Sequence, residues 1–264
     1  MNQPFDPYAA PKAAVAGYAP ITPIAAGQPI DFTATQVLKG SWAVFKASWK
    51  QLLSIYFAFG FGLLALGGAT MWPILSAILK KKGENFGSSQ LPAFAPADIV
   101  VASFGSIGIF ILAALCTPGL YRAALNAVTA QPIPISLLWS EMRFALRYAG
   151  LMLWSGLMVV LGFFTLGIFS VWWIFATLPV WYIIIDKDSG VFDAIQNAKE
   201  LTVARRSIIF GAYALIFLVS LPFRFVPGLN FLSSIVLSSI QQIMPAWIYA
   251  ATQGTLPSEF DGQN

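Results

Sequence analysis

The sequence lacks histidine altogether and contains a single cysteine, Cys116, among its 264 residues. Without a second cysteine no intrachain disulfide can form, and zinc or haem sites built on His and Cys have no set of ligands. We therefore expect no cofactor and no bound metal. A His general base is also excluded, and no pair of carboxylates falls within an apolar segment, so we expect no catalytic residue and no enzymatic activity.

Charged residues are scarce as well. They make up 10% of the chain, whereas hydrophobic residues make up 58% and the mean hydropathy is +0.73. Soluble domains usually carry about 25% charged residues, so the composition excludes an ordinary soluble globule and indicates insertion into a lipid bilayer. The formal net charge is only +4, and we expect no nucleic-acid partner.

Long apolar segments predict an all-α polytopic membrane helical bundle. Crossing a hydrocarbon core of about 30 Å takes about 20 apolar residues. The stretch from Tyr148 to Ile185 has 38 residues without a charge, which is too long for one straight crossing at about 1.5 Å per residue. We divide it near Thr165 to Gly167 into two spans joined by a tight turn, with a re-entrant hairpin as the alternative. The six predicted transmembrane helices are 52–79, 99–121, the two parts of 148–185, 208–225 and 229–252.

The two ends of the chain differ from this membrane domain, which we place at residues 33–252. Residues 1–32 are rich in Pro and Ala and have no apolar period, which predicts a disordered tail. Residues 253–264 form a short polar tail.

The distribution of positive charge predicts the orientation of the chain in the membrane. With the amino terminus inside, the cytoplasmic segments carry eleven of the 15 Lys and Arg residues, although the external loops hold Lys80, Lys81 and Lys82. This bias predicts that both termini are cytoplasmic.

The segment before the first span has the pattern of a helix that lies in the membrane interface. Apolar residues recur at helical spacing, with lysines on the adjoining face. The apolar residues are Leu38, Trp42, Phe45, Trp49 and Leu52, and the lysines are Lys39, Lys46 and Lys50. Trp beside Lys is typical of a helix in the headgroup layer, and packing against other parts of the protein is the alternative. Thr33 and Gln36 could form a capping box at its start.

Two later connecting segments repeat this arrangement and predict amphipathic cytoplasmic helices between the hairpins. Residues 122–147 combine three arginines with apolar residues on one helical side. The segment Asp186 to Ser207 begins with turn residues Asp188, Ser189 and Gly190. Its apolar stripe consists of Val191, Ala194, Ile195, Ala198 and Leu201, and Arg205 and Arg206 follow as membrane-interface anchors where the chain re-enters lipid.

The acidic residues of this last connector do not match a calcium loop. An EF-hand loop needs an oxygen ligand at its fifth position, Gly at its sixth and Glu at its twelfth. Counted from Asp186, these positions are Gly190, Val191 and Asn197. We therefore interpret the acids as turn and capping residues.

Two stretches resemble a known family. "VLKGSWAVFKASWKQLL" and "LPVWYIIIDKDSGVFDAIQNAKELTVARRS" are similar to uncharacterised bacterial six-span membrane proteins related to the membrane domain of some glycerophosphodiester phosphodiesterases. Pro179, Asp186, Gly190, Ala194 and Ile195 match that family's pattern of a span ending in Pro, an acidic turn and the start of a cytoplasmic helix. The resemblance implies a multi-pass protein of the bacterial cytoplasmic membrane. It does not imply phosphodiesterase activity, because that chemistry belongs to a separate soluble barrel domain.

The sixth predicted span has a polar face within an apolar helix. Its residues at helical spacing are Asn230, Ser234, Ser238 and Gln241, joined by Ser239 and Gln242. Such groups should face protein or a cavity, either in hydrogen bonds between helices or along a substrate path. The interiors of the six predicted spans contain no charged side chain, because Arg224 lies near the external end of the fifth, and this argues against a proton pump.

These patterns predict a non-enzymatic scaffold or accessory subunit. Its partners would be the lipid bilayer and a membrane or cytoplasmic protein docked by the three connecting helices. The alternative is a permease or lipid-handling protein that uses the polar face of the sixth span. An intramembrane enzyme is the third reading.

Overall fold

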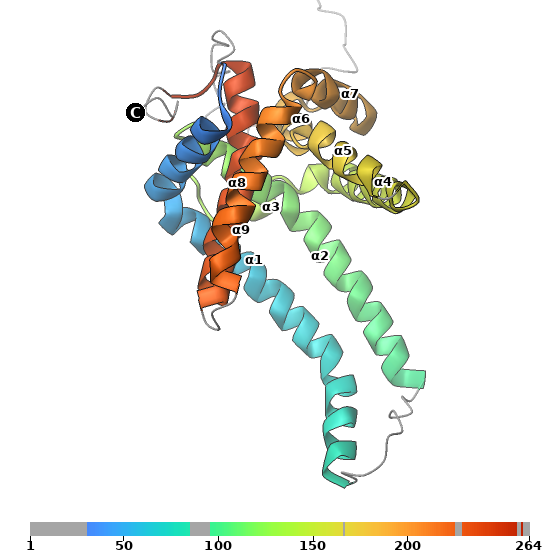
Figure 1. The fold of residues 1–264 in the computed structure, drawn as a ribbon. Helices are drawn as coiled ribbons and strands as arrows, with labels where there is room; N and C mark the ends of the chain where they lie inside the picture. The colour runs from blue at the N-terminus through green and yellow to red at the C-terminus, as the bar shows by residue number, and fades with distance from the viewer. Residues whose placement is uncertain (1–30, 85–95, 166, 225–228, 258–259, 261–264) are drawn as a thin grey trace, which may run out of the picture.

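The structure, a computed structural model, describes residues 31–84, 96–165, 167–224, 229–257 and 260. Within these residues the regular secondary structure is entirely helical. The elements shown in Figure 1 are α1 (Ala34–Glu84), α2 (Pro96–Val128), α3 (Leu137–Ser140), the 3-10 turn η1 (Met142–Phe144), α4 (Ala145–Phe163), α5 (Ile168–Thr177), α6 (Val180–Lys187), α7 (Val191–Thr202), α8 (Arg206–Arg224) and α9 (Leu229–Gln253). The predicted tail at 1–32 lies outside the described residues except for Asp31 and Phe32.

Three pairs of helices pack as hairpins. α1 contacts α2, α4 contacts α5, and α8 contacts α9, while α9 also packs on α1 and α2. The α1–α2 pair reaches far beyond the other helices, and α4 and α5 leave the bundle to one side (Figure 1). The beginning of α1, the end of α9 and the whole of α7 lie at the opposite end from the tip of the α1–α2 pair (Figure 1).

The described helices are compatible with a multi-pass membrane protein. Four segments are long and apolar enough to cross a bilayer: Ala34–Thr70, Ser103–Val128, Leu137–Phe163 and Ile168–Lys187. A fifth results if Val191–Thr202 and Arg206–Pro222, which are bent by 88°, count as one span. The described residues thus provide four or five of the six predicted spans. Large exposed apolar side chains cover these helices, such as those of Phe61, Phe104 and Phe163, as expected for surfaces that contact lipid.

The first predicted connector and the first predicted span form one continuous helix, α1, of 51 residues. No proline lies between Ala34 and Trp72, so nothing interrupts helical hydrogen bonding near Leu52. The predicted capping box is confirmed. The Thr33 main-chain N–H donates to Gln36 Oε1 at 2.8 Å, and the Gln36 N–H donates to Thr33 Oγ1 at 3.3 Å.

The second predicted connector, 122–147, is not a single amphipathic helix. α2 continues past the predicted end at Tyr121 to Val128. Ala130 then has a left-handed conformation with φ of 54°, and the Gln131 N–H donates to the Asn126 carbonyl at 2.7 Å. An irregular stretch with Pro132 and Pro134 follows, after which the short elements α3 and η1 lead into α4. Local composition suggested an interfacial helix, but the turn and the two prolines after it prevent one continuous helix.

The turn predicted near Thr165 to Gly167 is confirmed. α4 ends at Phe163 and α5 begins at Ile168. Gly167 has a φ of +78°, a conformation that glycine adopts without a steric penalty. Gly162 allows the two helices to approach closely, because a Cβ atom there would lie 2.2 Å from Ser170 Oγ.

The turn and helix predicted after Asp186 are also confirmed. Asp188 has a left-handed conformation with φ of 49°, and Gly190 is the N-cap of α7. Three residues of the predicted apolar stripe, Ala194, Ile195 and Ala198, are buried against α5 and α6. α7 ends at Thr202, where the chain bends by 88° into α8.

α6 belongs to the packed core, where it contacts α2 and α7. Its first six residues are apolar, which is typical of a buried helix, and Val180, Tyr182, Ile183, Ile184 and Ile185 are all buried. The buried tyrosine hydroxyl groups have partners. Tyr182 donates to the Gln242 carbonyl at 2.6 Å, and Tyr148 of α4 donates to the Trp181 carbonyl at 2.5 Å.

Gly119→Ala should destabilise the protein. The new Cβ would lie 2.3 Å from the Leu137 carbonyl oxygen and 2.6 Å from Leu138 Cα, and main-chain atoms cannot rotate away. We expect a loss of about 1–3 kcal/mol, measured as a lower thermal unfolding midpoint in detergent. Gly150→Ala is the matched control, since nothing lies within 4 Å of its Cβ position. Equal effects of the two substitutions would show that the close approach of α2 and α3 carries no stability.

Candidate functional site

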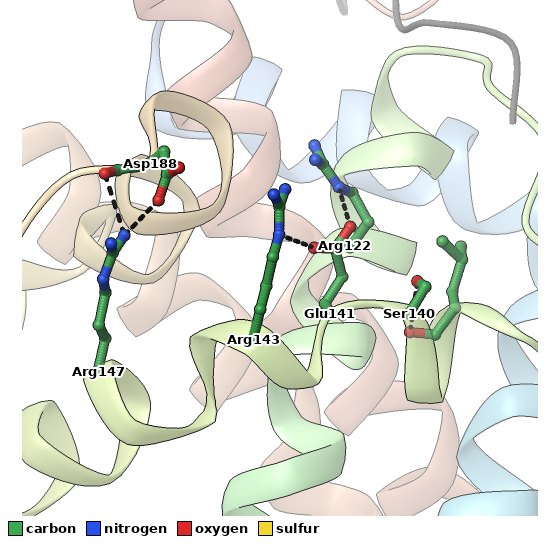
Figure 2. Close-up of polar contacts among 7 residues, drawn as sticks. Arg122, Ser140, Glu141, Arg143, Arg147 and Asp188 are labelled. Carbon is green, nitrogen blue, oxygen red and sulfur yellow. Dashed lines mark hydrogen bonds and ion pairs between the residues drawn. The ribbon is translucent and has the colours of Figure 1, made fainter. Parts of the chain in front are cut away.

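A buried ion pair joins α2 to the segment that precedes α4. Arg122 and Glu141 are only 8% and 7% exposed, and Arg122 Nε donates to Glu141 Oε1 at 3.1 Å. Arg143 Nε lies 3.8 Å from the other carboxylate oxygen, but its side chain is 66% exposed. Figure 2 shows Glu141 between the two arginines. A buried guanidinium without a counter-charge would strongly destabilise the fold. Arg122 can therefore be buried here only if Glu141 pairs with it.

Sequence reasoning missed this pair. Because the second span was predicted to end at Tyr121, Arg122 was assigned to the interface, and the spans were expected to hold no ionisable residue. The structure contradicts that expectation, since Arg122 lies within the candidate span Ser103–Val128. The residues that follow Arg122, "AALNAV", contain no Gly or Pro and continue the apolar pattern. This pattern indicates that the helix extends past Tyr121.

Two further contacts tie the α6–α7 turn to the same region. Arg147 of α4 forms an ion pair with Asp188 and also donates to the Asp188 carbonyl at 3.0 Å (Figure 2). Tyr249 of α9 donates from its hydroxyl to Asp186 Oδ2 at 2.5 Å. We refer to these residues as the charged cluster: Arg122, Glu141, Arg143, Arg147, Asp186, Asp188 and Tyr249.

The charged cluster joins helices rather than presenting reactive groups. Glu141 and Asp188 pair with arginines, and Asp186 accepts a hydrogen bond from Tyr249. Within the described residues no group of three or more His, Cys, Asp or Glu side chains could hold a metal ion. The geometry therefore favours a mechanical role, in which α2, α4, the α6–α7 turn and α9 keep a defined arrangement.

A second candidate site is a cavity of about 260 Å³ between the hairpins. We call it the central cavity. Its lining contains four aromatic rings, four uncharged polar side chains and no charged residue. The lining residues are Tyr121, Ser155, Val159, Trp173, Ile174, Thr177, Leu178, Trp181, Tyr213, Gln241, Gln242 and Pro245.

Hydrogen bonds hold several of the polar groups around the central cavity. Tyr56 donates to Gln242 Oε1 at 2.7 Å, and Tyr213 donates to the Gln241 carbonyl at 3.4 Å. Trp173 is 5% exposed, and its indole Nε1 has no hydrogen-bond partner among the described residues. A buried donor without an acceptor is unfavourable, so the lining has capacity for one more hydrogen bond.

The structure brings part of the predicted polar face of α9 to this cavity. Gln241 and Gln242 line it. Ser238 is exposed and Ser239 is buried. Asn230 and Ser234 belong to α9, but their side chains lie outside the described part of the chain.

The predicted interface anchors divide into two groups. Lys39, Trp42, Lys46, Trp49 and Lys50 are all exposed along the first part of α1, while Phe45 and Leu52 of the predicted apolar face pack into the core. The two arginines instead contact protein. Arg205 pairs with Asp31 at 3.4 Å, and the Arg206 guanidinium carbon lies 4.9 Å from the centre of the Trp172 ring.

No protein-family model, curated protein or solved structure matches this chain. The resemblance to the membrane domain of glycerophosphodiester phosphodiesterases therefore stays a prediction.

The buried ion pair should behave as a coupled unit. Arg122→Met or Glu141→Leu alone leaves an uncompensated buried charge and should cost about 3–5 kcal/mol, whereas the double variant should cost less than either single one. Thermal unfolding in detergent measures both effects. Arg143→Met, at the exposed arginine, should change stability by about 1 kcal/mol or less. Additive losses in the double variant would show that the two side chains are not coupled.

Proposed function

We propose that the chain is a non-enzymatic scaffold or accessory subunit of a bacterial cytoplasmic membrane. In this proposal α1, α2, α4, the α5–α6 unit, α8 and α9 cross the bilayer, both termini are cytoplasmic, and α7 lies on the inner leaflet. The main support is the charged cluster, because its contacts connect four parts of the chain at one end of the bundle. Such an end can present a surface of defined shape to a partner.

The exposed side of α7 is the proposed docking surface for a protein partner. Its opposite side is buried on α5 and α6, and Arg147 holds the turn that precedes it. Phe192, Asp193, Gln196 and Glu200 are exposed along the free side. One large apolar residue among polar ones is compatible with a small, selective contact.

The first part of α1 supports the placement of the end of the bundle that contains α7 at the inner membrane surface. Its exposed lysines and tryptophans lie along one helix, and Lys50 Nζ is 5.7 Å from the centre of the Trp49 ring. Lysines favour contact with an anionic inner leaflet, and tryptophans favour the headgroup layer. The two features together would hold α7 close to the cytoplasmic surface.

A photoreactive amino acid at Phe192 should form a discrete adduct with one protein in intact cells. The matched control is Phe163, which is 80% exposed at the tip of the α4–α5 hairpin and should crosslink to lipid only. The adduct would be detected by mobility shift and identified by mass spectrometry. Two results would contradict the proposal: equal protein adducts at both positions, or labelling of Ser189→Cys by an impermeant thiol reagent in a Cys116→Ser background.

Lipid handling is the second candidate function, and the central cavity favours it. The cavity combines apolar walls with the two glutamines of α9. Uncharged polar groups in an apolar site are suited to part of an amphiphile rather than to a hydrated ion. Val159 and Ile174 line the cavity and are also exposed on the outer surface, which would allow entry from the hydrocarbon region.

Ser238→Ala combined with Gln241→Ala separates the two candidate functions. If the protein handles lipid, this variant should unfold at the wild-type temperature but lose transbilayer movement of a fluorescent phospholipid in proteoliposomes. If the polar face only joins helices, the unfolding temperature should fall instead. Ser140→Ala, at an exposed residue of α3, is the control and should retain both properties. Absence of lipid movement in the wild-type protein would reject the lipid-handling candidate.

A further inference from the structure

Two cations lie over neighbouring tryptophans of α5. Lys199 Nζ of α7 is 4.9 Å from the centre of the Trp173 ring, and the Arg206 guanidinium carbon at the start of α8 is 4.9 Å from the centre of the Trp172 ring. Thr202 keeps this corner closed by donating from its hydroxyl to the Ala176 carbonyl at 3.1 Å. The bend between α7 and α8 therefore brings two positive charges to one pair of indoles.

Among the described residues, Lys199 and Arg206 differ from three other arginines in having no carboxylate partner. Arg122, Arg147 and Arg205 each pair with a carboxylate, whereas within the described residues neither Lys199 nor Arg206 forms an ion pair. Arg206 Nε is also buried without a hydrogen-bond partner. A guanidinium N–H in this position favours a charged oxygen acceptor.

Trp173 connects Lys199 to the central cavity, and Arg206 lies over the neighbouring Trp172. Lys199 covers one face of the Trp173 ring, this tryptophan lines the cavity, and its buried indole Nε1 lacks an acceptor among the described residues. The site thus offers cationic donors at one end, a neutral N–H donor next to them, and then apolar walls such as Ile174 and Leu178. A molecule that matches this order has an anionic group, a neutral oxygen acceptor and an apolar chain.

We propose that this site binds one anionic glycerophospholipid. Its phosphate accepts hydrogen bonds from Lys199 and Arg206, an ester carbonyl accepts one from Trp173 Nε1, and an acyl chain enters the central cavity. Other small anions lack the apolar chain, and uncharged lipids leave the two cations without an acceptor. The proposal gives a ligand class to the lipid-handling candidate and rests on the same cavity, but it requires binding alone and not lipid movement.

Titration of the full-length protein with dioleoyl phosphatidylglycerol in a maltoside detergent tests the site. The protein is labelled with 15N-tryptophan, and the Trp173 indole signal is assigned by its loss in Trp173→Phe. We expect a saturable shift of this signal. Lys199→Gln and Arg206→Gln should each weaken binding by about tenfold, as expected for loss of one charge-assisted hydrogen bond, and Lys199→Arg should restore it.

Matched controls use exposed cations elsewhere. Lys46→Gln on α1 and Arg143→Gln should bind as the wild type does, and each variant is first required to show the other tryptophan indole signals of the folded protein. No shift at Trp173, an equal loss of affinity in Lys46→Gln and Lys199→Gln, or equal binding of dioleoylglycerol would overturn the proposal. Binding without lipid movement in the proteoliposome assay would leave this site in place as that of a fixed lipid and reject only the handling function.

Discussion

The burial of Arg122 is the constraint on which the arrangement of the helices depends. A guanidinium within an apolar helix needs a counter-charge, and Glu141 can supply it only if the chain folds back along α2 after Val128. The turn at Ala130 and the irregular stretch with Pro132 and Pro134 allow that return. Gly119 then allows α3 to approach α2, since any larger residue would collide with the Leu137 carbonyl.

The position of Glu141 determines the contacts that follow. The same segment leads into α4, where Arg147 reaches the turn between α6 and α7. Tyr249 reaches that turn from α9. Tyr249 is buried, so the contact gives its hydroxyl an acceptor, whereas Arg147 and Asp188 are partly exposed. Hydrogen bonds and ion pairs therefore join one end of the bundle, and elsewhere apolar helices pack on one another, as α9 does on α1 and α2.

Two buried nitrogen donors without partners among the described residues lie in a different part of the molecule. Near α5 the indole of Trp173 and the guanidinium of Arg206 each keep a buried donor without an acceptor. The charged cluster shows that this fold can pair its buried donors, as Arg122 does with Glu141. The contrast between paired and unpaired donors distinguishes a cluster that stabilises the fold from a site suited to a ligand.

Local patterns were sufficient where neighbouring residues decide the structure. The capping box at Thr33, the turn at Gly167 and the helix start at Gly190 all depend on residues within about four positions of one another. The extent of α2 was predicted wrongly for the opposite reason. Hydropathy changes at Tyr121, but a helix continues until its hydrogen bonding is interrupted, which happens after Val128.

The sequence by itself determined an all-helical chain compatible with a membrane protein, because charge is scarce and several apolar segments are long enough to cross a bilayer. It also determined the main turns, because glycine and proline act on the backbone where they stand. Only the tertiary structure decided the partner of Arg122 and which residues line the central cavity. Those contacts join distant positions, such as Tyr56 and Gln242, which are 186 residues apart. They depend on how helices pack, and composition and periodicity do not specify which faces meet.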